Sequence, residues 1–383
     1  MEFSLTEEQR LIQQTAREFA DEKLAPLAAE YDRSEEFTAP QAKMLAEMGF
    51  LGMMVPEEYG GAGLDTVSYV LAMEEVSRAC AATSVTMTVQ NSLVCWPIEY
   101  FGTEEQKRKF LVPLAKGEIL GCYGLSEPAA GSDPASMATT AVEDGDSYVL
   151  NGSKIFISNG GVSQVAVVWT QTDRDLKHRG ITCFIVEADT PGFVVGAEEK
   201  KLGIRGSNTT ELHFEHCHVP KSNMLGSLGE GFKIAMQTLD GGRIGIASQA
   251  VGIGQACIDA AVKYSHERQA FGKPLSDLQA IQFKIADMAM EVQASRLLTL
   301  HAAWAKDQGV RFSKEAAMAK LHASEAATKA AHMAVQIHGG YGYLRDFPVE
   351  RLYRDARITE IYEGTSEIQR IVISSMVLKE GRR

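Results

Sequence analysis

A carboxylate near the C-terminus, Glu363, is the strongest candidate for acid–base chemistry in this sequence. It follows Tyr362 and precedes Gly364, between an arginine-rich stretch and the start of a helix. These neighbours predict a semi-apolar cleft that a thin ligand can approach. Such a cleft disfavours the ionised carboxylate and raises its pKa toward neutrality, as a general base requires. Alternatively, Glu363 only supplies negative charge near a helix N-terminus that Thr365 caps.

Two segments rich in small residues are candidate ligand cradles. Residues 123–133 contain two glycines and two serines, and small residues let backbone amides approach an anionic or carbonyl-rich ligand closely. The alternative is a plain surface loop. Residues 156–161 read Phe-Ile-Ser-Asn-Gly-Gly, which places an aromatic ring at a strand end. That ring either covers a planar cofactor or belongs to the core.

Three further segments combine glycine with polar or cationic residues. Residues 239–243 place Gly241 and Gly242 inside a helix, where each costs about 1 kcal/mol relative to alanine, so we expect another group to approach closely. Arg268 ends the same helix, where it either pairs with a phosphate or caps the helix C-terminus. Residues 336–342 end a later helix in a glycine cluster.

The composition is that of an ordinary globular protein. The chain has 383 residues, which is longer than one hydrophobic core usually grows, so two or three domains are expected. Its net charge of -12 argues against a nucleic-acid surface or an anionic membrane as partner. There is no apolar run of about 18 residues and no signal-peptide pattern at the N-terminus. Six scattered cysteines without a Cys-x-x-Cys pair fit a reducing cytoplasm, where we expect this chain.

Hydrophobic periodicity divides the sequence into three zones. Residues 1–120 have helical spacing and predict an N-terminal helical domain. Residues 121–228 follow a period of two and predict a middle domain, a small antiparallel sheet or barrel. Residues 229–383 return to the helical period and predict a C-terminal four-helix bundle of three long helices and a shorter one. The predicted fold class is therefore α+β and multidomain.

Local signals place the ends of several elements. Capping boxes at Thr6 and Thr103 start two helices of the first zone. Asp144-Gly145 and Asn151-Gly152 are turn signals between strand-like runs in the second zone. The shorter helix of the third zone begins after Thr365.

Taken together and in order, six of these motifs resemble the acyl-CoA dehydrogenase family over essentially the whole chain: Gly-Leu-Ser-Glu-Pro, Phe-Ile-Ser-Asn-Gly-Gly, Asp-Gly-Gly-Arg, Glu-Arg-x-x-Phe-Gly, Gln-Ile-His-Gly-Gly-Tyr-Gly and Ile-Tyr-Glu-Gly-Thr. The resemblance implies a helical domain, a middle β domain and a C-terminal helical bundle. It also implies FAD bound without a Rossmann fold. In agreement, Gly252-Ile253-Gly254 lies in a helical pattern and breaks the dinucleotide motif at Cys257.

The resemblance implies a role for each motif. Glu363 would remove the α-proton of an acyl thioester while the β-hydrogen leaves as hydride to flavin N5, and the Glu363 amide would polarise the thioester carbonyl with a ribityl hydroxyl. Flavin contacts are implied at Tyr123, Leu125, Ser126, Gly131, Ser132, Phe156, Ile157 and Ser158. Other FAD contacts, largely across a subunit boundary, are implied at Arg268, Phe271, Gln279, Gln336, Ile337, His338, Gly339 and Gly340, and also at Thr365, Ser366 and Glu367. Contacts to the acyl-CoA substrate are implied at Ser132, Asp240, Gly241, Gly242, Arg243 and Gly364.

Two positions distinguish branches of the family. In isovaleryl- and long-chain-type members the base stands at the position that Gly242 occupies here, so Glu363 has this role alone. Phe156 stands where many relatives have tryptophan, which we interpret as a subfamily mark. Residues 89–97 would line the acyl pocket and most resemble short-chain, butyryl-type members. Gln90 and Asn91 would fit poorly against a long alkyl chain.

The expected partners are a short-chain acyl-CoA and, as acceptor, electron-transfer flavoprotein or otherwise dioxygen. A medium-chain or 2-methyl-branched substrate and a non-catalytic acyl-CoA-binding homologue are the alternatives; the pathway stays open. The resemblance implies a homotetramer, and one helix has a small apolar face suited to contacts between subunits or within one. That face comprises Ala316, Ala319, Ala323, Ala326, Ala327 and Ala330.

We expect no metal. A di-metal site in a helical bundle needs Glu-x-x-His on two helices, whereas the only such pair, Glu215 and His218, lies in a strand-like stretch. With His213 these residues either form a local zinc site or are surface residues at a strand end.

Overall fold

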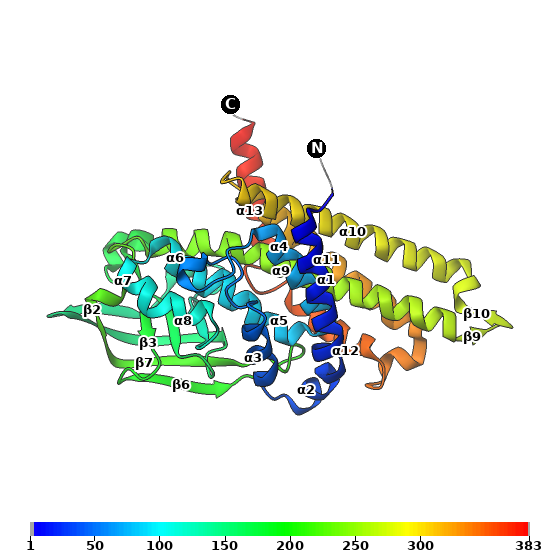
Figure 1. Ribbon diagram of the computed structural model, residues 1–383. Helices are drawn as coiled ribbons and strands as arrows, with labels where there is room; N and C mark the ends of the chain where they lie inside the picture. Colours follow the sequence, from blue (N-terminus) through cyan, green and yellow to red (C-terminus); the bar gives the residue numbers. More distant parts are fainter. Residues whose placement is uncertain (1–3, 382–383) are drawn as a thin grey trace.

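A computed structural model describes residues 4–381 and arranges them in the order helices, sheet, helices (Figure 1). The sheet lies at one end of the molecule, and the long helix α9 (Gly231–Glu267) runs from beside it to the opposite end. The N-terminal helices lie between the sheet and the C-terminal helices. The predicted α+β fold with this order of elements is confirmed.

The N-terminal part is helical, and both predicted capping boxes are present, at Thr6 and at Thr103. In each, the threonine side chain accepts a backbone N–H three residues on, while the glutamine there accepts the threonine N–H. The helices are α1 (Glu7–Phe19), α2 (Ala28–Ser34), α3 (Ala39–Glu47), α4 (Thr66–Ala79), α5 (Ala81–Thr88), α6 (Trp96–Phe101), α7 (Glu104–Gln106) and α8 (Val112–Ala115). A π-helical segment, η4 (Val89–Cys95), continues α5.

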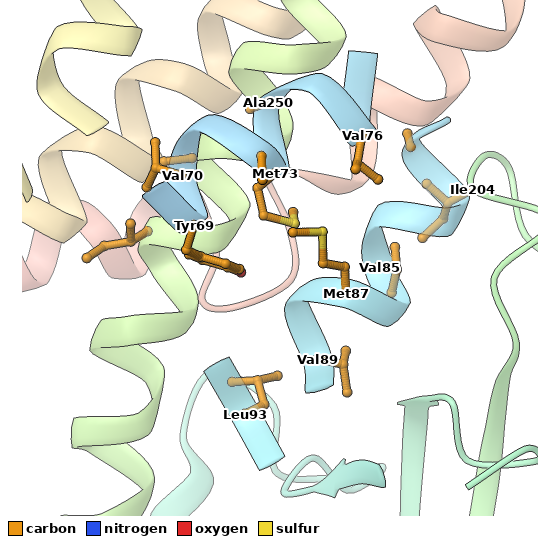
Figure 2. Packing of buried hydrophobic residues seen from close by; sticks show 14 of the residues in the cluster. Tyr69, Val70, Met73, Val76, Val85, Met87, Val89, Leu93, Ile204 and Ala250 are labelled. Carbon is orange, nitrogen blue, oxygen red and sulfur yellow. The ribbon is translucent and has the colours of Figure 1, made fainter. Parts of the chain in front are cut away.

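Helix α4 lies at the centre of this part, because almost all of its side chains are buried. Tyr69 and Met73 are 1% and 0% exposed. Figure 2 shows Met73 meeting Met87 of α5, with Ala250 of α9 beside it. Burying such a side chain stabilises the fold by about 1.5–3 kcal/mol. The packing of α4, α5 and α9 therefore makes a rigid wall on which η4 is held.

The middle part is one mixed sheet with the strand order β6-β7-β3-β2-β4-β5-β8, and β1 pairs with β4. Most pairs are antiparallel, as predicted. Two are parallel: β1 with β4, and the single pair between Thr140 and Gln171 that joins β2 to β4. The strands are β1 (Gly121–Gly124), β2 (Thr140–Asp144), β3 (Ser147–Ser158), β4 (Val165–Gln171), β5 (Ile181–Glu187), β6 (Phe193–Glu198), β7 (Thr209–Pro220) and β8 (Met224–Leu225).

The predicted turn at Asn151-Gly152 is wrong, because both residues lie inside β3. The pairing of β3 with β7 shifts between Leu150 and Gly152, which is a β-bulge. The Asn151 side chain accepts the His216 N–H at 2.9 Å, and Gly152 has φ 144°. The two residues thus bend a continuous strand. The predicted turn at Asp144-Gly145 is confirmed, since it joins β2 to β3.

The C-terminal part contains α9, α10 (Gln279–Asp307), α11 (Ser313–His338), α12 (Pro348–Ile358) and α13 (Ser366–Glu380). The short strands β9 (Gln269–Ala270) and β10 (Lys273–Pro274) form a hairpin between α9 and α10. The three long helices and the helix after Thr365 match the prediction, whereas α12 was not predicted. Within residues 4–381 no helix has both the length and the apolar character needed to span a bilayer.

The alanine face of α11 is turned into the chain's own core. Its six members are between 0% and 3% exposed, and all but Ala326 belong to the cluster that also contains residues of α9 and α10. Close packing of α11 on both helices uses this face, because small side chains allow helices to approach closely. The sequence left open whether this face makes contacts between subunits or within one subunit. In the structure it makes contacts within one subunit. The face consists of Ala316, Ala319, Ala323, Ala326, Ala327 and Ala330.

Candidate active site

A cavity of about 200 Å³ opens where the N-terminal helices, the sheet and α9 meet. One wall comes from α5 and η4, a second from the loop after β1 and the end of β3, and a third from α9 and the segment before α13. The cavity brings together predicted residues that are up to 241 positions apart, from Tyr123 to Gly364. Those in its lining are Tyr123, Leu125, Ser126, Gly131, Ser132, Phe156, Ile157, Ser158, Arg243, Glu363 and Gly364.

The carboxyl group of Glu363 is enclosed in this cavity. Its Oε2 atom is buried and has no hydrogen-bond partner. Burial raises the pKa of Glu363 to about 7, against opposing effects of the positive charges of Arg243 and Lys320. A carboxylate with this pKa is present in both protonation states near neutral pH, as the cleft of Tyr362 and Gly364 predicts.

Gly242 makes room for that carboxyl group. A Cβ atom there would lie 2.3 Å from Glu363 Oε2 and 3.0 Å from Leu93 Cδ2, so any side chain would displace the carboxylate. Gly241 is different, because its nearest neighbour would be Lys306 Nζ at 3.8 Å. The close approach expected for both glycines is therefore present only at Gly242. Asp240, Gly241 and Gly242 are not part of the cavity lining.

Arg243 is a buried cation held by Asp240. It is 5% exposed, its Nη1 donates to the Asp240 carboxylate, and its Nε has no partner. Asp240 also accepts the Ser313 hydroxyl at the start of α11. Burial raises the pKa of Asp240, and the charge of Arg243 opposes this rise. The pair links α9 to α11 and directs an unsatisfied N–H group toward the cavity wall.

The loop after β1 is fixed by a buried ion pair that the sequence analysis did not identify. Lys154 of β3 donates to Glu127 at 2.6 Å and to the Leu125 carbonyl at 3.2 Å. Glu127 also accepts the N–H groups of Ala138 and Thr139. Glu127 is the glutamate of the Gly-Leu-Ser-Glu-Pro motif, and its presence in that motif was the only indication in the sequence that this residue has a role. Glu127 holds the loop in place and is not part of the cavity lining.

Two aromatic residues differ in how they are held. Tyr123 is packed against Trp169 with ring centroids 4.3 Å apart, and its buried hydroxyl has no partner. Phe156 has φ 57° and is 65% exposed. A left-handed backbone is costly for a bulky residue and marks functional sites when it persists. The structure therefore excludes the interpretation of Phe156 as a core residue and leaves the interpretation that its ring covers a planar cofactor.

The remaining predicted FAD residues lie elsewhere. Arg268, Ile337, His338, Gly339 and Gly340 line a separate, more open depression of about 440 Å³, which shares no lining residue with the cavity. Its base is aromatic: His338 stacks on Tyr264 with centroids 4.2 Å apart, and the guanidinium of Arg268 lies over the Tyr341 ring. Phe271, Gln279 and Gln336 are exposed and outside this lining.

The segment after Glu363 begins α13. Thr365 is its N-cap and accepts the Ile368 N–H at 3.4 Å, so the alternative role of Thr365 as a cap is present as well. The Ser366 hydroxyl is buried without a partner, whereas Glu367 is exposed. None of the three lines the cavity.

Gln90 and Asn91 do not act as predicted, because neither faces the cavity. Gln90 donates to the Leu114 carbonyl at 2.8 Å, and its Oε1 accepts the Gly121 N–H at 3.0 Å. Asn91 donates to the Phe50 carbonyl at 2.8 Å. Their neighbours in η4, Val89 and Leu93, line the cavity instead. Val89 and Leu93 are four positions apart and share one face of this helical segment. Gln90 and Asn91 lie on another face, so their polarity says nothing about what the cavity binds.

A polar cluster closes the cavity behind Thr88. The buried Tyr69 hydroxyl donates to Thr88 Oγ1 at 3.1 Å and lies 3.2 Å from Ser92 Oγ. Gly245 of α9 packs against them, since a Cβ there would lie 2.2 Å from Thr88 Oγ1. Of these four residues only Thr88 lines the cavity.

The histidines considered for zinc are surface residues. His213 lies 3.2 Å from Glu211, and His218 lies 4.0 Å from Asp144, where it is 57% exposed. Among residues 4–381, histidine, cysteine and carboxylate side chains do not gather in any group of three or more able to hold a metal ion.

Three family models match the chain in the order of its three parts. They describe the N-terminal domain of acyl-CoA dehydrogenase over residues 6–118, the middle domain over 122–217 and the C-terminal domain over 229–378. With an enclosed carboxylate of raised pKa at the junction of these parts, fold and site define one class of enzyme. The chain belongs to the acyl-CoA dehydrogenase family.

Individual relatives agree over the full length. The chain is 55% identical over 378 residues to the mitochondrial short-chain specific acyl-CoA dehydrogenase of Bos taurus, and this covers 99% of this chain and 92% of that protein. Butyryl-CoA dehydrogenase from Megasphaera elsdenii superposes with a TM-score of 0.97 at 47% identity, covering 99% and 100% of the two chains. A chain from a structure of the electron transferring flavoprotein of Acidaminococcus fermentans gives a TM-score of 0.98 at 51% identity, with coverage of 99% and 100%.

Proposed function

We propose that this protein is an FAD-dependent dehydrogenase that converts a short-chain acyl-CoA to the trans-2-enoyl-CoA and passes the electrons to electron-transfer flavoprotein. The observation that carries this proposal is the enclosed, unpaired carboxylate of Glu363 in a cavity of about 200 Å³. A non-catalytic acyl-CoA-binding homologue has no use for such a base.

The residues of the cavity fit the flavin part of FAD, which accepts a hydride when bound. The loop after β1 offers small residues, and at Gly131 nothing lies within 4 Å of an added Cβ. The unpartnered Tyr123 hydroxyl and the exposed Phe156 ring stand at the same wall. The depression around Arg268 supplies a cation and aromatic rings suited to a pyrophosphate and an adenine. The family resemblance implies that a second copy of the chain holds the other half of each FAD, and the absence of a shared lining residue agrees with this.

In this proposal the chain's own residues move the proton. The Glu363 carboxylate accepts the substrate α-proton, and the Glu363 amide donates to the thioester carbonyl. The positive charge of Arg243, which pairs with Asp240, lowers the pKa of Glu363 and so maintains a fraction of the ionised base at neutral pH. Walls of Val89, Leu93 and Tyr362 exclude water from the reacting carbons.

Substrate size follows from the end of the cavity. The cluster of Tyr69, Thr88 and Ser92 behind the acyl side, and the packing of Gly245 against it, leave room for a short chain. The names of the Bos taurus and Megasphaera elsdenii relatives support the same choice. Medium-chain and 2-methyl-branched acyl-CoAs are the alternatives to be tested.

The experiment is anaerobic reduction of the purified protein's flavin by acyl-CoAs from C3 to C16. We expect a yellow protein with one non-covalent FAD per chain, bleached fastest by butyryl-CoA. A folded, colourless protein that does not take up FAD would refute the FAD assignment. Fastest bleaching by C8 or by 2-methylbutyryl-CoA would overturn the short-chain assignment only.

The acceptor is tested by reoxidation of the reduced enzyme. The full-length similarity to a chain from the Acidaminococcus fermentans flavoprotein structure supports electron-transfer flavoprotein. We expect reoxidation by that protein to outpace reoxidation by air at least 100-fold. Rapid formation of hydrogen peroxide in air would assign dioxygen instead.

We further propose a homotetramer in the cytoplasm, built from domains 1–120, 121–228 and 229–383. Large apolar side chains are exposed on α10 and α13, among them Met290 at 63% and Leu378 at 68%, and such surfaces favour subunit contacts. All six cysteines are buried and unpaired, which suits a reducing compartment. Light scattering should give roughly four times 41.7 kDa.

A further inference from the structure

A buried lysine lies directly beneath the segment that carries Glu363. Lys320 is on α11, is 0% exposed, and donates from Nζ to the carbonyl oxygen of Gly364 at 2.7 Å. An ammonium group is costly to bury unless it is paired and hydrogen-bonded. No carboxylate of the described chain forms a salt bridge with Lys320, so its burial is not explained by an ion pair.

The turn above this lysine has an unusual backbone. Glu363 has φ 55° and Gly364 has φ 89°, so two successive residues are left-handed. A non-glycine residue holds this conformation only when its surroundings impose it. A Cβ at Gly364 would lie 2.8 Å from Gln369 Nε2, so this position also needs glycine.

Three contacts hold the turn in place. Gln369 donates from Nε2 to the carbonyls of Glu363 at 3.1 Å and Gly364 at 2.8 Å. The Ser366 N–H donates to the Glu360 carbonyl at 3.0 Å and closes the turn. Lys320 of α11 provides the third contact. Next to the turn, the Tyr362 hydroxyl also donates to Gln249 of α9. Lys320 therefore ties the turn itself to α11, whereas Gln369 and the Ser366–Glu360 contact fix its local shape.

Lys320 is also one of two cations that act on the base. Arg243 and Lys320 are the positive charges that oppose the raised pKa of Glu363. Arg243 is already committed to Asp240. The charged groups that face Lys320 are Glu363, Arg243, Glu360 and Glu367, and among these carboxylates Glu363 acts on it most strongly. Burial lowers the pKa of Lys320 to about 7, and the charge of Glu363 opposes that decrease.

We propose that Lys320 is a positioning residue for the catalytic base: its ammonium group fixes the Glu363–Gly364 turn through the Gly364 carbonyl and favours the ionised carboxylate of Glu363. This inference rests on the proposed role of Glu363 as the base. It assigns a function to a side chain that touches neither the cavity nor its ligand.

The sign of the effect on pH dependence follows directly. A nearby positive charge stabilises the ionised carboxylate and lowers its pKa. Loss of Lys320 therefore raises the pKa of Glu363 further, so the base is ionised only at higher pH. The acid limb of kcat/KM moves to higher pH as a result. A lysine that only fills space would lower activity or stability without moving this limb.

The test compares holoenzyme variants Lys320→Met, Lys320→Arg and, as control, Lys329→Met. Lys329 is on the same helix and 63% exposed. With butyryl-CoA we expect Lys320→Met to shift the acid limb upward by about one pH unit and to lower kcat at least tenfold at pH 6.5, with KM changed less than threefold. Lys320→Arg should restore the limb, and Lys329→Met should match the wild type. An unmoved limb in Lys320→Met, or Lys320→Arg no better than Lys320→Met, would overturn the proposal.

Hydrogen exchange at the Ser366 amide gives a readout that does not depend on turnover. We expect exchange at least tenfold faster in Lys320→Met than in the wild type, because the turn is released from α11. If Lys320→Met does not fold, Lys320→Gln, which keeps a donor but not the charge, carries the pH-profile measurement, with the same limb shift expected. Wild-type exchange rates in Lys320→Met would contradict the proposal. If no acyl-CoA reduces even the wild-type flavin, the proposed function fails instead, and the exchange experiment still tests the contact.

Discussion

A carboxylate that accepts a proton near neutral pH needs surroundings that keep it from being strongly acidic without holding it protonated. Glu363 meets this condition through burial, which raises its pKa to about 7, and through two cations that limit the rise. The same carboxylate has an oxygen atom without a hydrogen-bond partner. A residue retained only for its charge at a helix N-terminus would have its oxygens on backbone N–H groups.

Replacing the base tests this at the scale of one atom. Glu363→Gln keeps the shape and removes proton acceptance, so flavin reduction by butyryl-CoA should fall about 1,000-fold or more while FAD and acyl-CoA still bind. Stopped-flow reduction and equilibrium binding measure the two effects separately. Turnover within tenfold of the wild type would place the base elsewhere.

A second residue-scale prediction concerns the glycine pair of α9. Gly242→Ala puts a methyl group 2.3 Å from Glu363 Oε2, so flavin reduction should slow about 100-fold. Gly241→Ala is the matched comparison, because its methyl group meets no atom closer than 3.8 Å and alanine gains about 1 kcal/mol of helix propensity. We expect Gly241→Ala to reduce its flavin within about threefold of the wild type and to unfold at a higher temperature. Equal rates in the two variants would refute the steric argument.

At the scale of elements, the buried pair of Glu127 and Lys154 holds the loop after β1 on β3. Glu127→Ala leaves Lys154 buried without its partner and should cost about 3–5 kcal/mol. Lys154→Met should cost less, since Glu127 keeps the N–H groups of Ala138 and Thr139. Calorimetry of the two holoenzyme variants measures which substitution lowers the free energy of unfolding more.

The exposed pair of Lys221 and Glu143 is the control for this order. Lys221→Met should change the free energy of unfolding by less than about 1 kcal/mol. A smaller loss from Glu127→Ala than from Lys154→Met would show that the loop does not depend on this pairing.

We expect η4, which supplies Val89 and Leu93 to the cavity lining, to limit the length of the acyl chain. Leu93 lines the cavity, so Leu93→Ala should raise kcat/KM for hexanoyl-CoA relative to butyryl-CoA about tenfold, at a cost of about 2–5 kcal/mol in stability. Leu45→Ala, at a fully buried position of α3 outside the cavity, should lose similar stability without a change in preference. The same shift in both variants would mean that loosening of the core, and not the added space, changes specificity.

At the scale of the whole molecule, cofactor binding and assembly should be coupled. The family resemblance implies that a second copy of the chain completes each FAD site. In agreement, the depression around Arg268 shares no residue with the cavity. Arg268→Ala should weaken FAD binding at least tenfold and lower the melting temperature and the tetramer fraction together. Lys263→Ala, exposed on the same helix and outside the depression, should change none of these. A monomer that keeps its FAD on dilution would contradict the coupling.

The sequence by itself determined those features of the structure that depend only on residues close together in the chain. The capping boxes at Thr6 and Thr103 require only a threonine and a glutamine three positions apart, so they could be predicted. The β2–β3 turn and the change of period near residue 121 are equally local, whereas the burial of Glu363 depends on η4 and α9 across the cavity. The order of the six motifs also predicts the fold, because they match one family along the whole chain and that family has a helical domain, a β domain and a helical bundle in this order.

Only the tertiary structure decided which way side chains point and what lies across from them. Gln90 and Asn91 turn from the ligand to backbone groups of Leu114, Gly121 and Phe50, which are distant in the sequence. The sequence could not show whether Asn151-Gly152 forms a turn or a β-bulge, because the bulge exists only through the pairing of β3 with β7.

Lys320 gives no sign in the sequence of its place beneath the Gly364 carbonyl. The alanine face of α11 is likewise assigned to the chain's own core only by the helices packed against it. In each case the side chain is stabilised by groups that folding brings next to it and that bury it or pair with it. These groups are distant in the sequence, so the neighbouring residues cannot reveal which groups they are.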